Sequence, residues 1–386
     1  MKKNNQKLII ISVVILVLSF IIFYAGQFLF SGKKTVIENG EQTAASTQPS
    51  ASTDEKPFPV LYNHTSAKIG GHAQEIFTLE FDPLDERVEF KPALSYDSIF
   101  GFEKLSEICG RTEAYAAVNG GFFYEYGDPV GMVAIDGELY MGASGYDPVL
   151  IVDDKGAHFE KITSYLSFSH NGSVTNINML NRTARDGNII MYTDNYGSSN
   201  RAKQRNTSVR IENNIITAIF EDAEEVLLKK DTYLISFFGK SSSLPKQLGM
   251  KTGDTANVRI TPDKKGIYQA YECGSMLVSS GQITAPEKDR WAGTLLNRDP
   301  RTAVGIKDNG NIVLIVADGR QPGYSSGLTG TELAEYMIGL GIRDAAMLDG
   351  GASSQIFAEG ALRNRPSYRG IERPVAGAFI IKVKDT

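Results

Sequence analysis

Two apolar segments that each end in aspartate followed by glycine constrain most strongly what this chain can fold into. The first, NIVLIVADGR, ends at Asp318, and the second, AAMLDGG, reaches Asp349. Between them, GYSSGLTGTELAEYMIGLGI is a Gly/Ser loop followed by apolar residues at helical spacing. Short apolar runs that stop at glycine are typical of buried strands. We therefore expect two strands, with a helix between them, whose ends deliver carboxylates to a shared cleft.

The composition is that of a globular protein that binds no nucleic acid. With 386 residues, 42% of them hydrophobic, the chain can bury a full core. Its net charge is −5, and no cluster of Lys and Arg is interleaved with aromatic residues. A nucleic-acid partner would require such a basic surface, so this class of function is excluded.

The first 57 residues divide into three parts. Residues 1–7 carry three lysines, residues 8–30 are apolar and uncharged, and residues 31–57 are small, polar and without periodicity. The apolar run is long enough to cross a bilayer as a helix, whereas a cleaved signal peptide would need a shorter core and a small-residue cleavage site. We expect a short cytoplasmic N-terminus, a transmembrane signal-anchor, and a flexible linker. The remainder would then be the extracellular domain of a single-pass cell-membrane protein.

Residues 58–386 predict a single large α+β domain with a mixed, mainly β core and few helices. Short segments that alternate apolar and polar residues recur through this part, for example HAQEIFTLEF and VRIENNIITAIF. Helical spacing appears in FEKLSEIC, residues 102–109. No repeat of fixed period and no break in composition divides the domain.

The cysteines and histidines do not predict a zinc site. Cys109 and Cys273 have no second Cys or His at metal-ligand spacing. A disulfide between them and two buried free thiols are both compatible with the sequence. No cofactor is expected, although Ca²⁺ would suit an oxygen-rich site of Asp, Asn and carbonyl groups.

Seven motifs, taken in order, resemble the phosphodiester glycosidase family. They are NGGFF (residues 119–123), NMLNR with IIMYTDNYG, CGSMLVSSGQI, PRTAVGI with DGR, SxGLTGTELA, LDGGASSQ, and NRPS followed by ER (residues 372–373). Each motif alone is common in turns, but their order over roughly residues 70–383 is specific. The chain departs from the family at Glu272 and Cys273, where glycine is more usual.

The resemblance implies hydrolysis of a sugar-1-phosphodiester between the anomeric carbon and oxygen. Phosphate is a leaving group of low basicity, so the reaction needs charge stabilisation more than a strong general acid. Arginine can grip two phosphate oxygens with its planar guanidinium group. A carboxylate must also face the oxocarbenium-like centre.

These requirements select the candidate residues. The catalytic candidates are Asp349, Asp318 and Glu372, and the candidates for binding substrate or phosphate are Asn119, Arg301, Arg320, Arg373, Gly350, Gly351, Ser353 and Ser354. The amides of Gly350 and Gly351 would form an anion nest. Structural roles compete: the arginines could pair with these carboxylates, the serines could cap a helix, and Asn119 could simply adopt a left-handed turn.

We expect an anchored extracellular hydrolase that acts on glycosyl phosphates of the cell envelope or of exopolysaccharide. The alternatives are a non-catalytic protein for glycan binding or polysaccharide assembly, and a general glycosidase that needs no phosphate. The sequence leaves open the sugar, the stereochemical outcome, the oligomeric state and whether a metal is bound.

Overall fold

The structure, a computed structural model, describes residues 56–261 and 268–384. The predicted cytoplasmic N-terminus, the signal-anchor (8–30) and nearly all of the linker (31–57) lie outside the described residues. Within the part that is described, none of the helices has the length and apolar character needed to span a bilayer.

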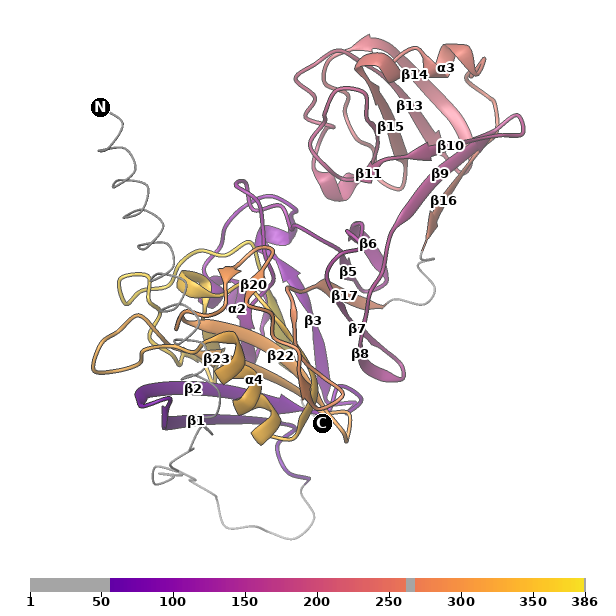
Figure 1. The fold of residues 1–386 in the computed structure, drawn as a ribbon. Helices are drawn as coiled ribbons and strands as arrows, with labels where there is room; N and C mark the ends of the chain where they lie inside the picture. Colours follow the sequence, from indigo (N-terminus) through magenta and orange to yellow (C-terminus); the bar gives the residue numbers. More distant parts are fainter. Residues whose placement is uncertain (1–55, 262–267, 385–386) are drawn as a thin grey trace, which may run out of the picture.

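A seven-stranded sheet forms the centre of the fold (Figure 1). In order across the sheet, its strands are β1 (Val60–Ile69), β2 (His72–Phe81), β23 (Ile312–Ala317), β22 (Arg301–Lys307), β24 (Ile342–Met347), β18 (Met276–Ser279) and β19 (Gln282–Ile283). Strand β22 is antiparallel to both β23 and β24. Therefore β23 and β24 run in the same direction and end at the same edge of the sheet.

Helix α4 (Gly330–Gly339) covers one face of this sheet (Figure 1). It begins after Thr329, whose hydroxyl accepts from the amide of Glu332, while the Glu332 carboxylate accepts from the amide of Thr329. This reciprocal capping satisfies two amides that the first helical turn would leave unpaired. The buried Leu333 and Met337 then pack with side chains of the central sheet.

A five-stranded sheet packs against the other face of the central sheet. Its strands, in order, are β26 (Ala361–Leu362), β25 (Ile356–Ala358), β4 (Ala116–Asn119), β27 (Gly377–Val383) and β3 (Val88–Leu94). Phe90 connects the two layers, because its ring lies 4.9 Å from that of Phe81 and 5.2 Å from that of Phe379. Helix α2 (Leu105–Thr112) packs on this second sheet. The helix predicted at 102–109 is confirmed, three residues further along the chain.

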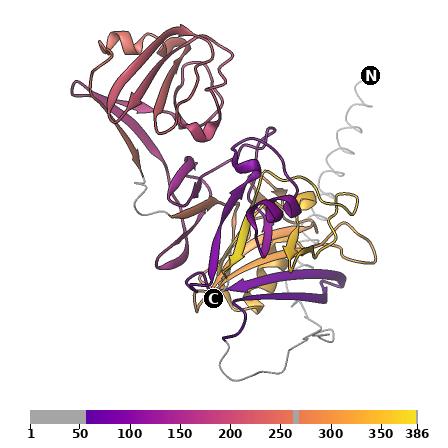
Figure 2. The ribbon, with the colours of Figure 1, turned by 180° about the vertical axis from the view of Figure 1, so that it is seen from behind.

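The remaining sheets extend away from these layers. One contains β6 (Glu138–Met141), β5 (Val133–Ile135), β17 (Gln269–Glu272), β7 (Val149–Asp153) and β8 (Gly156–Glu160). A three-stranded sheet contains β10 (Ser173–Ile177), β9 (Tyr165–His170) and β16 (Ala256–Thr261). A further five-stranded sheet contains β11 (Met179–Leu180), β12 (Ile189–Tyr192), β15 (Tyr233–Phe238), β13 (Asn206–Glu212) and β14 (Ile215–Ala223). In both views these two sheets form a lobe that projects from the rest (Figure 1, Figure 2).

Short elements complete the described chain. They are α3 (Leu244–Gln247), the 3-10 turns η1 (Ser95–Asp97), η2 (Asp194–Tyr196), η3 (Gly239–Ser241) and η5 (Gly351–Ser353), and the strand pair β20 (Lys288–Asp289) and β21 (Gly293–Thr294).

The prediction of a mainly β core with few helices is confirmed, but the α+β label overstates the helices. A single cluster of buried apolar side chains runs from Phe77 in the central sheet through Val118 and Leu150 to Tyr192 in the lobe. This shared core is consistent with one domain.

Candidate active site

Asp318 and Asp349 lie just beyond the ends of β23 and β24. Across β22, Arg301 pairs with Ala317 and Ala303 pairs with Met347. Since neighbouring strands are about 4.8 Å apart, the two strand ends are separated by about 10 Å. Both aspartates therefore lie at the same edge of the sheet, and the shared cleft expected from the sequence stays a prediction.

Asn119, at the end of β4, holds the backbone of Asp349. Its Nδ2 donates to the Asp349 oxygen at 2.6 Å, and its Oδ1 accepts from Thr302 Oγ1 at 2.9 Å and from the Gln355 amide at 3.1 Å. The amide of Asp349 in turn donates to the Gly120 oxygen at 3.2 Å. Asn119 is buried and its polar atoms are occupied. It positions the site, and it does not have a free group for the sugar contact that the sequence suggested.

The carboxyl group of Asp349 is buried and has a perturbed pKa, although the residue as a whole is only half-buried. Burial raises the pKa of Asp349 to about 6, and this effect outweighs the lowering by a hydrogen bond from Ser353 and by the charge of Arg373. Solvent nevertheless reaches part of the residue. A carboxyl group with such a pKa, in a residue that solvent partly reaches, can exchange protons near neutral pH.

Two guanidinium groups flank the turn that follows Asp349. Arg373 Nη1 donates to Ser353 Oγ at 3.1 Å. Arg320, whose φ is +60°, lies against Gly351, where an added Cβ would stand 3.3 Å from Nη2. Arg320 Nε also donates to Asp299 Oδ1 at 2.7 Å, yet half of its side chain is exposed. Both arginines are therefore placed to meet an anion beside Asp349.

Asp318 differs sharply from Asp349. It is 1% exposed, and its oxygens accept from Asn364 Nδ2 at 2.7 Å, from the Arg365 amide at 2.8 Å and from the Tyr324 hydroxyl at 3.2 Å. Burial raises the pKa of Asp318, and these donors lower it. Such a set of partners anchors the segment around residue 364 to the strand end.

Two other candidates also make structural contacts. Arg301 is 2% exposed, and its guanidinium donates to the backbone oxygens of Leu328 at 3.0 Å and Asn297 at 2.9 Å. Both carboxylate oxygens of Glu372 accept from Ser106, at 2.8 Å from the amide and 2.6 Å from the hydroxyl. Glu372 thus satisfies the first turn of α2.

The predicted anion nest is not formed as expected. The amide of Gly351 donates to the Pro300 oxygen at 2.8 Å, so it does not point to a ligand. Neither Ser353 nor Ser354 caps a helix N-terminus, because both lie at the C-terminal end of η5. Ser353 is buried and faces Arg373, whereas the buried hydroxyl of Ser354 has no hydrogen-bond partner in the described part of the chain.

Several residues of this region were not selected from the sequence. Asn364 joins Asp318 to the oxygen of Ser354, and Gln355 Nε2 donates to the oxygen of Arg373 at 2.9 Å. Asn364 lies in the motif NRPS and Gln355 in the motif LDGGASSQ. A polar side chain inside a motif and beside a buried strand is the sequence feature that could have identified each of them as a site residue. Tyr271, on β17, has no such feature in its sequence context.

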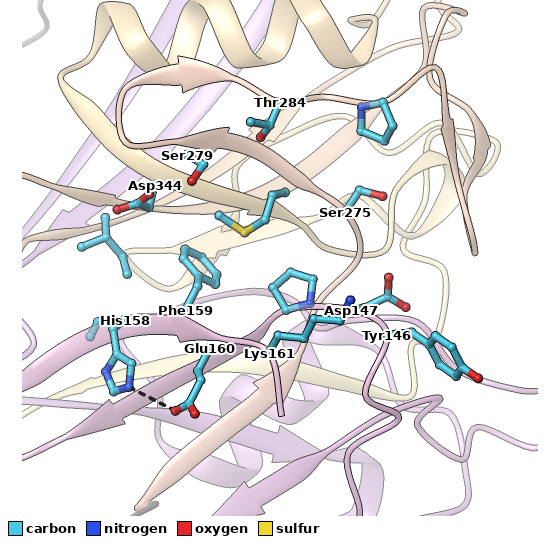
Figure 3. Close-up of a pocket in the computed structure, with 15 residues that line it drawn as sticks. Tyr146, Asp147, His158, Phe159, Glu160, Lys161, Ser275, Ser279, Thr284 and Asp344 are labelled. Carbon is cyan, nitrogen blue, oxygen red and sulfur yellow. Dashed lines mark ion pairs between the residues drawn. The ribbon is translucent and has the colours of Figure 1, made fainter. Parts of the chain in front are cut away.

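A separate groove lies between β8 and the strands β18 and β24, with a volume of about 590 Å³ (Figure 3). His158, Glu160, Ser275 and Asp344 are among its lining residues, and His158 Nε2 lies 4.0 Å from Glu160 Oε2. None of the candidate residues lines this groove, so its chemistry is separate from that of Asp349.

In residues 56–261 and 268–384, no group of three or more His, Cys, Asp or Glu side chains is arranged to hold a metal ion. Whether Ca²⁺ binds stays a prediction. Cys109 and Cys273 are both buried and free, which favours thiols over the disulfide.

Comparison with known proteins supports the family resemblance in the second half of the chain. Residues 205–382 match the family model described as phosphodiester glycosidase. The SPbeta prophage-derived uncharacterized protein YomE of Bacillus subtilis (strain 168) is 35% identical over 121 residues, which are 31% of this chain and 18% of that protein.

Solved structures share the fold. A hypothetical protein from Synechocystis superposes with a TM-score of 0.71 at 22% identity, covering 84% of this chain and 62% of that one. A putative exported protein from Burkholderia pseudomallei K96243 gives 0.67 at 21%, covering 81% and 74%. The zebrafish N-acetylglucosamine-1-phosphodiester alpha-N-acetylglucosaminidase catalytic domain gives only 0.43 at 14%, covering 91% and 88%, which is too low to support an argument.

The resemblance to the phosphodiester glycosidase family is thus confirmed over residues 205–382, the part of the chain that carries Asp318, Asp349, Arg320 and Arg373.

Proposed function

We propose that this protein is a hydrolase that cleaves a sugar-1-phosphodiester between the anomeric carbon and oxygen. The observation that carries the proposal is the placement of Asp349, with a pKa of about 6, beside a turn flanked by the guanidinium groups of Arg320 and Arg373. The family match over residues 205–382 supports the same chemistry.

Asp349 is the base in this reaction. Its carboxylate takes a proton from the water that attacks the anomeric carbon, while the bond from that carbon to the phosphate oxygen breaks. The products are the free sugar and a phosphate monoester. A base with a pKa near 6 is largely ionised at neutral pH and still accepts a proton readily.

Arg320 and Arg373 stabilise the departing phosphate. The charge that develops on the leaving oxygen needs donors that are already in place, because reorienting them during the reaction would raise the barrier. Arg320 is restrained by Asp299 and Arg373 by Ser353. Asp318, with its oxygens already hydrogen-bonded, holds the neighbouring segment in place and does not meet the substrate.

The cellular context is a second part of the proposal. The apolar run at residues 8–30 supports a membrane anchor, with the catalytic domain outside the cell. The substrates would then be glycosyl phosphates of the cell envelope or of exopolysaccharide.

The test measures sugar release by the full-length chain from a panel of sugar-1-phosphodiesters. Asp349→Asn should abolish turnover. Asp344→Asn is the matched control, because Asp344 lies on β24, the strand that leads to Asp349, and its carboxylate contacts the amide of Ser280 at 2.8 Å and the guanidinium of Arg343 at 3.7 Å. Full activity in Asp349→Asn would refute the assignment of the base. Binding without turnover across the panel would indicate a glycan-binding protein, and equal cleavage of neutral aryl glycosides would indicate a general glycosidase.

A further inference from the structure

Tyr271, on β17, is a buried tyrosine whose hydroxyl proton has no acceptor among the described residues, although the backbone N–H of Gly121 approaches the hydroxyl oxygen. It is 1% exposed, and its ring packs 5.3 Å from that of Phe379. An unpaired buried hydroxyl costs about 1 to 3 kcal/mol, and phenylalanine would fill the same space without this cost. The hydroxyl therefore calls for an explanation.

The glycines after Asn119 make room for this ring beside Asp349. A Cβ on Gly121 would stand 2.6 Å from Tyr271 Cε1, and a Cβ on Gly120 would stand 3.2 Å from its hydroxyl oxygen. The oxygen of the same Gly120 accepts the hydrogen bond from the amide of Asp349. The ring of Tyr271 and the backbone of Asp349 thus both lie against Gly120.

Electrostatics connects the same two groups. Burial, and secondly the charge of Asp349, raise the pKa of the Tyr271 hydroxyl. The hydroxyl therefore keeps its proton at any physiological pH, and a phenol that cannot ionise remains a donor. Asp349 is the first charged group after burial to act on it, so the ionised carboxylate is the natural acceptor.

We propose that Tyr271 is a positioning residue for Asp349, whose carboxylate it stabilises by donating a hydrogen bond when Asp349 is ionised. The bond would hold the carboxylate in the orientation needed to accept a proton from water. This inference deepens the proposed function and rests on it for its kinetic consequence, but the effect on the ionisation of Asp349 can be measured without turnover.

The chain offers a matched control. Tyr192, on β12, is also fully buried, and its hydroxyl is also without a hydrogen-bond partner in the described residues. Burial and the neighbouring Tyr196 raise its pKa, and no carboxylate contributes. Tyr271→Phe and Tyr192→Phe therefore remove the same atom from equally buried sites, only one of which is near Asp349.

The experiment is a carboxyl-carbon NMR titration of the full-length chain labelled with ¹³C aspartate, with Asp349→Asn used to assign the signal. Loss of a donor to a carboxylate disfavours its ionised form, so Tyr271→Phe should raise the pKa of Asp349 by about one unit. Tyr192→Phe should leave it unchanged. No shift in Tyr271→Phe, or equal shifts in both variants, would overturn the proposal.

Kinetics and stability complete the test. In Tyr271→Phe, kcat should fall roughly tenfold with little change in KM, and the acid limb of kcat/KM should move to higher pH. Tyr192→Phe should be at least as stable as the wild type, because it loses an unpaired hydroxyl. Tyr271→Phe should be less stable than the wild type only above pH 6, where the ionised carboxylate of Asp349 would lose its donor. Destabilisation by Tyr271→Phe that is as large at pH 4 as at pH 8 would mean that the hydroxyl has another structural partner, which contradicts the proposal. If the NMR shift is found but no form of the protein turns over any phosphodiester, the proposed function fails and the positioning role stands.

Discussion

The side-chain amide of Asn119 donates a 2.6 Å hydrogen bond to the backbone oxygen of Asp349 and so joins the end of β4 to the end of β24. These two strands belong to different sheets. The position of the candidate base therefore depends on how the two sheets pack against each other. A shift of one sheet relative to the other would move Asp349 relative to Arg373.

The role of Asn119 predicts a large loss of stability in Asn119→Ala. The substitution leaves the Thr302 hydroxyl and the Gln355 amide buried without their acceptor, which should cost about 3 kcal/mol of unfolding free energy. Chemical denaturation of the full-length chain measures this cost. Asn195→Ala is the control, because Asn195 donates only to Glu138 in an exposed pair, and it should change stability by less than about 0.5 kcal/mol.

The raised pKa of Asp349 predicts a characteristic dependence of stability on pH. The folded protein holds the proton up to about pH 6, whereas an unfolded aspartate loses it near 3.8. The free energy of unfolding is therefore highest, as far as Asp349 is concerned, below pH 3.8, where the group is protonated in both states. This stability is lost as the pH rises through 6, because the buried group must then ionise. Asp349→Asn should be more stable than the wild type by about 2 to 3 kcal/mol at pH 8, with the difference disappearing towards pH 4. A difference that is constant with pH would contradict the assigned pKa.

The two arginines of the site should contribute mainly to catalysis. Replacing Arg320 or Arg373 by Gln should lower kcat/KM by a factor of about 10² to 10³, because each removes a preorganised donor to the departing phosphate. Arg205→Gln, at an exposed pair with Asp222, provides the comparison and should leave kcat/KM unchanged. Steady-state assays on a sugar-1-phosphodiester test this, and equal effects of all three substitutions would rule out a specific role.

Asp318 should matter for folding more than for chemistry. Asp318→Asn replaces an acceptor by a donor opposite the Asn364 side chain or the Arg365 amide, so the unfolding free energy should fall by about 2 kcal/mol. The folded fraction should keep most of its kcat, as active-site titration or activity at low temperature can establish. A loss of kcat as large as that in Asp349→Asn, with stability intact, would restore the catalytic role expected from the sequence.

The two cysteines should be inert in the folded protein. Burial raises the pKa of Cys109 and of Cys273 to about 12, so almost no thiolate is present at pH 8. Ellman's reagent should therefore label no thiol under native conditions and both in denaturant. Rapid labelling of the native protein would show that a thiol is accessible.

The sequence alone determined the strands that end at Asp318 and Asp349, the helix between them, and the family over residues 205–382. The spacing of apolar residues indicates local structure, because it follows from which side chains a strand or helix must bury. Glycine at the end of an apolar run indicates where the strand stops. The common sheet edge was not predicted, because it follows from the pairing of both strands with β22.

Only the tertiary structure decided which of these polar residues can act. Asp318 and Asp349 have the same sequence context, yet Asp318 is enclosed by three donors from residues 324–365, whereas Asp349 remains partly open and carries the perturbed pKa. Tyr271 comes from β17, far from either motif in the chain, and is brought towards the site by packing against Gly120 and Gly121. Burial and hydrogen-bond partners depend on long-range contacts, which no local pattern of residues encodes.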